Sequence, residues 1–341
     1  MNLWAHSDKG FAIFTAMKDY KLVLVIGNGF DLDLGLPTSY KDFLHSPSFY
    51  EFLENANILR YHRISIDEGN IFKYLQRQLN LNNWIDIEAE LKRLATDTEK
   101  VFDESQGRAI PVLNKANQGI KDSFEVLRRQ LSSYLRHMPY DLVNNDSYAI
   151  KLLKVLNGYG EMCEIITYNY TDIHLLKDRV GSDIKIPIDH VHGEIKDNSI
   201  IIGFQDDVEI DKSFSFMIKS FSPYFRSHNV RQKLLDADEI IFFGHSLGET
   251  DYHYFEDLFK FQSQPEHYKS SKTIRIFTYD ENSRIDVLFQ LRAMNNKRTD
   301  MLFDLNDFEI YRTKDDSAKI KVYLEQLNER LHDKWIDNGL R

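Results

Sequence analysis

The sequence predicts an α/β protein with a doubly wound, mostly parallel sheet and a large helical insertion. Three observations support this fold class. Short, continuous apolar runs recur along the chain and end in small or polar residues, a pattern typical of strands covered on both faces. Amphipathic helical stretches separate the later runs. Residues 40–158, by contrast, contain helical patterns and no convincing strand.

The composition indicates the general class of the protein. The chain has 341 residues, 42% of them hydrophobic, which is enough for one large domain or two ordinary ones. Its net charge of −10 argues against nucleic acid as a partner, because duplex binding depends on basic surface that neutralises phosphates. Cys163 is the only cysteine, so we expect no structural zinc and a cytoplasmic location.

Neither a membrane span nor a signal peptide is expected. The chain has no uninterrupted apolar run of about 18 residues, the length that a spanning helix needs. The first residues, MNLWAHSDKGFAIFTAMKDY, lack a basic region followed by a long apolar core. Met17 lies shortly before the first strand, so we expect residues 1–16 to be an upstream extension that the fold does not need.

The first expected strand is KLVLVIG (21–27), and it runs into the turn GNGFD (27–31). Paired glycines allow a close approach of the backbone, and the amides that follow could bind an anion. Leu32 occupies the third glycine position of a dinucleotide fingerprint, so that fingerprint is incomplete. The alternative is a tight turn from strand to helix that binds no ligand.

A helical lobe is expected between the first and second strands. Apolar periodicity predicts its helices at about 40–56, 71–80, 84–104, 117–138 and 147–157. The polar stretch KANQGIKDS (115–123) is expected to be a loop within this lobe. Glu88 falls on the apolar face of one predicted helix, where a carboxylate either has a buried partner or borders a site.

Further strands are expected after the insertion. Their ranges are EIITYN (164–169), KIPIDHVHG (185–193), SIIIGF (199–204), EIIFFGHS (239–246), TIRIFTYD (273–280) and FEIYRT (308–313). The first of these ends in TYNYTD (167–172), and its Asn169 is suited to orienting an amide or a water molecule. The alternative is that Asn169 only bridges the loop.

The stretch HVHG (190–193) supplies the candidate base. Alternation along a strand would place both histidines on one face, where they could bind a metal ion. No further ligands of recognised spacing accompany them, however. His192 lies beside Gly193 at a strand terminus and is better interpreted as a general base. The alternative is a core histidine that a carbonyl satisfies.

The stretch GHSLGETD (244–251) closes another strand with small and hydroxyl residues. Its backbone amides and Ser246 are suited to a phosphate or a ribose. The motif G-x-S-x-G also matches the nucleophile elbow of serine hydrolases. That reading requires a later histidine in a strand-end loop, and none is evident after Ser246.

Taken in order, these landmarks resemble the AbiH-type bacteriophage abortive-infection proteins. The motifs that carry the resemblance are IGNGFDLDLGLPTSYKDF, NWIDIEAEL, ITYNYTD, HVHGEI followed by IIIGF, and FFGHSLGETDYHYF, which span about residues 20–260. The resemblance implies a bacterial antiviral defence protein. An activity harmful to the host must be silent in healthy cells, so we expect a phage-derived trigger or assembly into a homo-oligomer.

The same landmarks resemble, more distantly, the sirtuin-like NAD-binding fold. This implies that residues 1–39 and 159–341 form a sirtuin-like nucleotide-binding domain, a Rossmann variant, with 40–158 as a helical cap lobe. It also implies NAD as ligand or substrate, without the four-cysteine zinc module of sirtuin deacylases.

By this resemblance Asn169 and His192 form the catalytic pair. The nucleotide contacts that it implies are Gly27, Asn28, Gly29, Phe30, Asp31, Pro37, Thr38, Gly193, Gly244, His245, Ser246, Asp251 and Asp280. A sirtuin would have Asp-Phe-Arg where this chain has TSY (38–40), so Tyr40 and Phe30 are the candidates for shielding the reacting sugar.

The expected activity is hydrolysis of NAD or a related nucleotide at its N-glycosidic bond. One alternative is a nucleotide-sensing module that binds its ligand without turnover. Another is a metal-dependent nuclease or phosphohydrolase in which Asp31, Asp33 and Glu88 hold Mg²⁺. At least one of the two aspartates is expected to face ribose hydroxyls or a developing cation.

Overall fold

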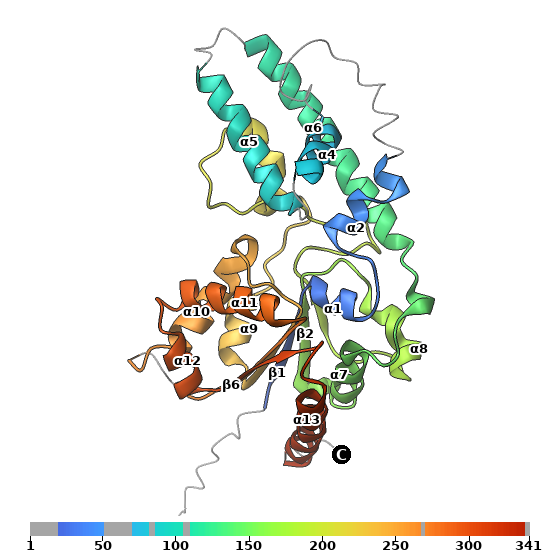
Figure 1. Cartoon of the computed structure of the whole chain (residues 1–341), viewed down its shortest axis with the longest axis vertical. Coiled ribbons are helices and arrows are strands. Elements are labelled where there is room, and N and C mark those ends of the chain that lie inside the picture. Colours follow the sequence, from blue (N-terminus) through green and yellow to red (C-terminus); the bar gives the residue numbers. More distant parts are fainter. Residues whose placement is uncertain (1–19, 51–69, 82–85, 105–109, 267–269, 338–341) are drawn as a thin grey trace, which may run out of the picture.

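The computed structural model describes residues 20–50, 70–81, 86–104, 110–266 and 270–337. A six-stranded parallel sheet with the order β3-β2-β1-β4-β5-β6 forms its centre (Figure 1). The strands are β1 (Leu22–Ile26), β2 (Cys163–Thr167), β3 (Ile188–His190), β4 (Glu239–Phe243), β5 (Thr273–Thr278) and β6 (Asp307–Arg312). The extension expected at residues 1–16 lies outside the described residues.

The strand order reverses at β1, which pairs with β2 on one side and with β4 on the other. In open α/β sheets ligands bind beyond the carboxyl ends of the strands at such a reversal. The turns after β1 and β4 touch here, because Gly27 N donates to Phe243 O at 3.0 Å and Gly29 N donates to Gly244 O at 2.9 Å. The fold therefore indicates where a site is to be sought.

Helices cover both faces of the sheet, as expected for a doubly wound fold. One face packs against α1 (Asn28–Asp33), α7 (Tyr148–Asn157) and α13 (Ser317–Asp337). The other face packs against α9 (Val230–Asp236), α10 (Tyr252–Gln262), α11 (Glu281–Met294) and α12 (Thr299–Leu305) (Figure 1). Successive side chains of β1 enter the two cores alternately, because strand side chains point to opposite faces. The predicted α/β class is confirmed.

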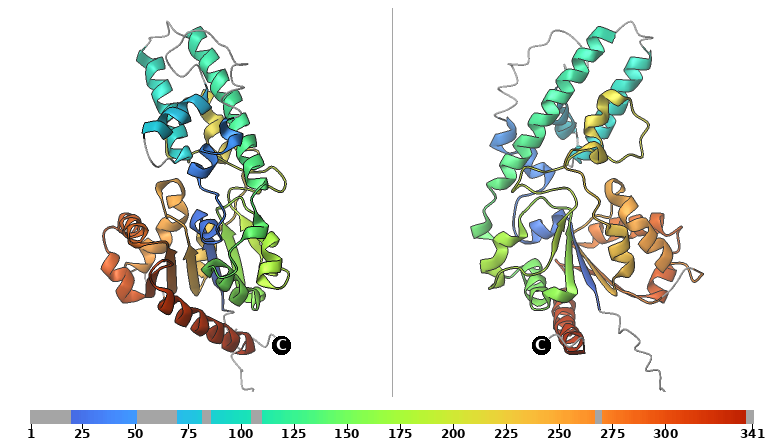
Figure 2. Two further views of the ribbon diagram at one scale, coloured as in Figure 1. Left: turned by 45° about the vertical axis from the view of Figure 1, so that its right-hand side comes forward. Right: turned by 180° about the vertical axis from the view of Figure 1, so that it is seen from behind.

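A second group of helices lies beyond the carboxyl ends of the strands (Figures 1 and 2). It contains α2 (Tyr40–Leu44), α4 (Ile71–Leu81), α5 (Ile87–Glu104) and α6 (Ile110–Arg136), which share one hydrophobic cluster. The same cluster includes apolar side chains from residues 195–218, among them those of η6 (Lys212–Met217). A segment that follows β3 in sequence thus packs against these helices. α7 instead packs against the sheet.

Most of the predicted helices are confirmed. Those expected at 71–80, 84–104, 117–138 and 147–157 correspond to α4, α5, α6 and α7, with residues 82–85 outside the described part. The loop expected at 115–123 is wrong, because α6 runs through it without interruption. The helix expected at 40–56 begins at Tyr40 but is interrupted after Leu44, where α2 ends. Residues 47–50 are helical again, and residues 51–56 are not described.

The strand expected at 199–204 is also wrong. Of these residues only Phe204 makes a β contact, an isolated parallel bridge with Ile218. The apolar side chains of Ile200 and Ile202 pack with the helical cluster instead, so this segment does not join the sheet. Among the described residues no helix combines the length and apolar character that crossing a membrane would require.

Candidate functional site

A cavity of about 450 Å³ lies at the strand-order reversal, beyond the carboxyl ends of β1, β2 and β4. Its size is in the range of small-molecule sites, roughly 300–1,000 Å³. The turns after these strands form its walls together with α2 and the start of α5. The sequence-predicted residues that line it are Gly27, Asn28, Asp31, Thr38, Asn169, His192, Gly244, His245, Ser246 and Asp251.

Other predicted contacts do not line this cavity. They are Gly29, Phe30, Pro37, Gly193 and Asp280. Phe30 is buried in the core, where its ring packs edge-on against Phe243 at a centroid distance of 5.4 Å, so it cannot shield a sugar. Tyr40, the other candidate for that role, does line the cavity.

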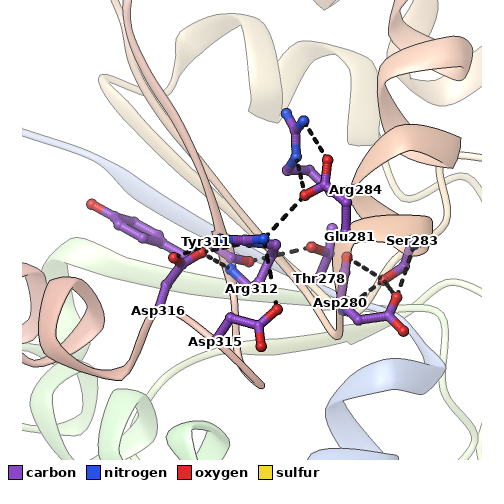
Figure 3. Close-up of polar contacts among 9 residues, drawn as sticks. All are labelled: Thr278, Asp280, Glu281, Ser283, Arg284, Tyr311, Arg312, Asp315 and Asp316. Atoms are coloured by element: carbon purple, nitrogen blue, oxygen red, sulfur yellow. Dashed lines mark hydrogen bonds and ion pairs between the residues drawn. The ribbon is translucent and has the colours of Figure 1, made fainter.

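Asp280 has a structural role in this fold. It is the N-cap of α11, and its carboxylate accepts from Ser283 N at 3.1 Å while Ser283 Oγ accepts from Asp280 N at 2.9 Å (Figure 3). Beside this cap, Glu281 pairs with Arg312, which also pairs with Asp316 (Figure 3). The Asp280 carboxylate therefore caps the start of α11, after β5, which lies two strands away from β1 in the sheet.

The paired glycines serve the contact between the two turns. A Cβ atom at Gly27 would come within 2.5 Å of His245 Cα, and one at Gly29 within 2.6 Å of Gly244 Cα. The amides of Gly27, Gly29 and Phe30 all donate to backbone carbonyls. They are therefore not free to hold a phosphate, in contrast to the expectation from the sequence.

Of the two aspartates after this turn, Asp31 faces the cavity. It is 2% exposed, and its carboxylate accepts from Thr171 Oγ1 at 3.0 and 3.1 Å. Burial raises the pKa of Asp31 to about 7, against the opposing effect of hydrogen bonds from Thr171. Asp33 instead accepts from Ala149 N at 2.8 Å, at the start of α7. The magnesium site that would use both aspartates is thus not formed.

We expect Asp31→Asn to change how stability depends on pH. The Asp31 carboxyl ionises near its ordinary pKa of 3.8 when unfolded, and burial raises that pKa to about 7 in the folded protein. Between these values the folded state binds more protons than the unfolded state, so the free energy of unfolding falls as pH rises from about 4 to about 7. Asparagine cannot ionise, so the variant should gain roughly 2–4 kcal/mol relative to the wild type over that interval. Urea unfolding at pH 4, 6 and 8 measures this gain.

Asp178→Asn is the matched control, because Asp178 is an exposed aspartate on α8 (Lys177–Val180), outside the cavity. The free energy of unfolding of Asp178→Asn should change with pH by the same amount as that of the wild type. If the free energy of unfolding of Asp31→Asn also changed with pH as the wild type does, the Asp31 carboxyl would not bind a proton more tightly in the folded protein.

A buried cluster of charged groups adjoins the cavity. Lys219, in η7 (Lys219–Phe221), is 1% exposed, and its Nζ lies 2.8 Å from Glu88 Oε2 and 3.6 Å from Asp251 Oδ1. Burial works to lower the pKa of Lys219, but Asp251 and Glu88 outweigh it and hold that pKa above its usual range. Glu88 thus has both a buried partner and a place in the cavity wall.

The two carboxylates of this cluster differ in their pKa. Burial raises the pKa of Glu88 to about 7, although Lys219 opposes the rise. Burial also acts to raise the pKa of Asp251, but Lys219 and His192 outweigh it and hold that pKa well below its usual range. One ammonium therefore stabilises one ionised carboxylate and leaves the other able to hold a proton near neutral pH. Such separation of two carboxyl groups is typical of acid–base sites.

His192 is buried and lines the cavity directly beside this cluster. Its Nε2 lies 3.2 Å from Asp251 Oδ1 and 3.3 Å from Lys219 Nζ. Burial and the nearby ammonium lower the pKa of His192, so the imidazole is neutral at neutral pH. β3 ends at His190, which does not line the cavity, so the two histidines of the H-x-H motif do not act together. Among the described residues no group of three or more His, Cys, Asp or Glu is placed to hold a metal ion.

His245 faces the same carboxylate from the turn after β4. Leu247 N donates to its Nδ1 at 3.0 Å, so the ring carries its proton on Nε2, which lies 3.8 Å from Asp251 Oδ2. Burial lowers the pKa of His245 to about 4. The Tyr168 ring packs edge-on against His192 and His245, with centroid distances of 5.2 and 4.6 Å, and holds both imidazoles in place.

Asn169 connects the cavity wall to the glycine turn. Its Nδ2 donates to Gly27 O at 3.0 Å, and its backbone N–H donates to Thr167 Oγ1 at 3.1 Å. The residue therefore braces the end of β1 in addition to lining the cavity. Both of the readings that the sequence left open for Asn169 are compatible with this geometry.

The residue that sequence reasoning missed is Lys219. Its only signal is a lysine within the apolar stretch FSFMIKSF (214–221), because a charged side chain in such a run needs a buried partner. That partner, Glu88, comes from a helix more than a hundred residues earlier in the chain.

Most of the chain matches a known protein family. A family model described as "Bacteriophage abortive infection AbiH" matches residues 23–270. This range contains every residue that lines the cavity. No curated protein matches the chain.

Proposed function

The chain belongs to the AbiH family of bacteriophage abortive infection proteins, and on that premise we propose that it cleaves a nucleotide at its N-glycosidic bond. The family indicates a role in phage defence. The proposed site is the cavity beyond β1, β2 and β4, and the proposed substrate is NAD or a related nucleotide. Loss of that nucleotide would arrest the infected cell together with the phage.

One observation carries this proposal: a neutral, buried imidazole and a carboxyl with a raised pKa line the same cavity. Cleavage of an N-glycosidic bond passes through an oxocarbenium-like sugar and needs an activated water. In the proposal His192 takes the proton of that water or of a ribose hydroxyl, since its lowered pKa keeps it neutral. Asp31, when ionised, stabilises the developing cation, and Asn169 orients the water or the base.

The sheet topology supports a sirtuin-like nucleotide-binding core as part of this proposal. The order β3-β2-β1-β4-β5-β6 is that of doubly wound dinucleotide-binding folds, whose ligand lies at the strand-order reversal. We propose that the core comprises the described residues of 1–39 and 159–341, together with α7, which packs against the sheet. The helices α2, α4, α5 and α6 would form a cap lobe, and the position of Tyr40 and Glu88 in the cavity wall supports that role.

A second candidate function is nucleotide sensing without turnover. The observation that favours it is that the two proposed catalytic groups already have protein partners. Asn169 Nδ2 donates to Gly27 O, and His192 Nε2 lies within 3.3 Å of Lys219 Nζ. A ligand could then bind between them while the cap lobe changes its contacts with a trigger or a second copy.

The proposed function is tested by nicotinamide release from NAD, with purified protein in the presence and absence of phage-infected lysate. Release is expected in at least one condition, and His192→Ala should reduce it by about 10²–10⁴-fold, the usual contribution of a general base. His137→Ala is the matched control, because His137 is an exposed histidine at the end of α6. Full activity of His192→Ala would contradict the assigned mechanism.

Metal removal distinguishes the proposed hydrolysis from a metal-dependent nuclease or phosphohydrolase. The proposed hydrolysis needs no metal ion, so dialysis against EDTA is expected to leave nicotinamide release unchanged. Strict loss of activity in EDTA, with recovery on adding Mg²⁺, would instead support a metal-dependent nuclease or phosphohydrolase. Calorimetry that shows stoichiometric binding of intact NAD without release would support the sensing function.

A further inference from the structure

The charged residues that line the cavity are mostly acidic. They are Asp31, Asp86, Glu88 and Asp251, with Lys41 as the one cation among the described lining residues. Lys41 is exposed on α2 and lies at the rim. Lys219 stands behind the wall, where it pairs with Glu88 and Asp251. The two lining histidines have lowered pKa values and carry no charge at neutral pH.

This lining offers few cationic partners to a phosphate group. Proteins bind phosphates with arginine, lysine and free backbone amides at helix starts or nests. No arginine occurs among the described residues that line the cavity. The amides of Gly27, Gly29 and Gly244 donate to the carbonyls of Phe243, Gly244 and Phe277. α1 is also only six residues long, so its start adds little positive potential.

The same lining suits a cationic or polyhydroxylated group. Asp31 is buried against the cavity, where its carboxylate accepts from the Thr171 hydroxyl, and among the described residues it has no ammonium or guanidinium partner. Tyr168 also lines the cavity, and its buried hydroxyl has no hydrogen-bond partner among the residues that the structure describes. A buried hydroxyl without a partner is costly, and a ligand that bonds to it would remove that cost.

We propose that this cavity takes the positively charged nucleoside end of its ligand, an N-ribosylated pyridinium or a base of like charge, and leaves the phosphate groups outside. The proposal deepens the proposed glycosidic cleavage and rests on it for the identity of the scissile bond. The preference for positive charge concerns binding alone and can be measured without turnover.

The charge balance of the reaction agrees with an acidic wall. The C1′–N bond breaks, and its electron pair neutralises the pyridinium nitrogen. The water oxygen forms the new bond to C1′, and the water proton passes to His192 and then to solvent. The positive charge moves from the base to the sugar and leaves as a proton, so a carboxylate at Asp31 stabilises each stage.

The test uses two ligands that differ in charge. Nicotinamide riboside is a cation, whereas its dihydro form is neutral and of nearly the same shape. Calorimetry is done at about pH 8, above the pKa of Asp31, on full-length His192→Ala so that cleavage does not consume the ligand. The cationic riboside is expected to bind at least about tenfold more tightly than the neutral form, and Asp31→Asn in the same background should remove most of that preference.

Equal binding of the two ribosides, or tighter binding of ADP-ribose than of the cationic riboside, would overturn the charge proposal even if the wild-type protein cleaves NAD. A clear preference for the cation, with no nicotinamide released from any substrate, would uphold the charge proposal and reject the proposed function. The charge proposal and the proposed function can therefore be rejected independently of each other.

Discussion

Replacing Lys219 by methionine is expected to lower the free energy of unfolding by about 3–5 kcal/mol, because the change leaves buried carboxylates without their counter-charge. The ammonium lies 2.8 Å from Glu88 Oε2 and 3.6 Å from Asp251 Oδ1, in a position that is 1% exposed. Methionine fills a similar volume but cannot compensate either charge. Urea unfolding at pH 7.5, compared with the wild type, gives the measurement.

A double variant distinguishes lost charge compensation from lost packing. Adding Asp251→Asn to Lys219→Met removes the ionised carboxylate, so we expect much of the lost stability to return. A loss below about 1 kcal/mol for Lys219→Met would contradict the assigned role of the cluster.

Gly244→Ala is the second variant with a large expected effect, a loss of roughly 3 kcal/mol or more. Gly244 has a φ of +65°, which costs an L-residue about 1–2 kcal/mol. A Cβ atom there would also lie 2.4 Å from Gly29 Cα and from Phe30 N, and overpacking of this kind adds about 1–3 kcal/mol. The turns after β1 and β4 would have to separate, so we also expect ligand binding in the cavity to weaken.

Gly181→Ala is the matched control for backbone strain. Gly181 has a φ of +94°, and a Cβ atom there would meet nothing within 4 Å. Gly181→Ala should therefore lower the free energy of unfolding only by the cost of the backbone conformation, about 1–2 kcal/mol. Equal losses for Gly244→Ala and Gly181→Ala would show that the two turns do not need to approach each other closely. Thermal and urea unfolding of the two variants give the comparison.

The sequence was sufficient to predict six strands of the sheet and which strand ends lie around one cavity. Continuous apolar runs such as LVLVI (22–26) are typical of buried parallel strands, and the polar residues that follow them must gather at one edge. Asn169, His192 and Ser246 do line one cavity for that reason. Their roles remain proposals, because spacing along a chain does not show which hydrogen bonds a side chain makes.

The rest depends on long-range packing that local patterns do not contain. The apolar run at 199–204 has the composition of a strand, but its side chains pack with the helical cluster. Asp31 and Asp33 have similar surroundings in the sequence, yet one lines the cavity and the other receives the first amides of α7. Lys219 finds its carboxylate on α5, a partner that becomes evident only when the chain is folded.

The most direct test of the central claim is a crystal structure of His192→Ala soaked with NAD. We expect the nicotinamide ribose to lie in the cavity between Asp31 and the space left by the imidazole, with the phosphates outside it. A ligand bound elsewhere would contradict the claim, for example in the second cavity of about 500 Å³ beside Arg226 and Arg231. So would a first cavity that stays empty while NAD binds stoichiometrically in solution.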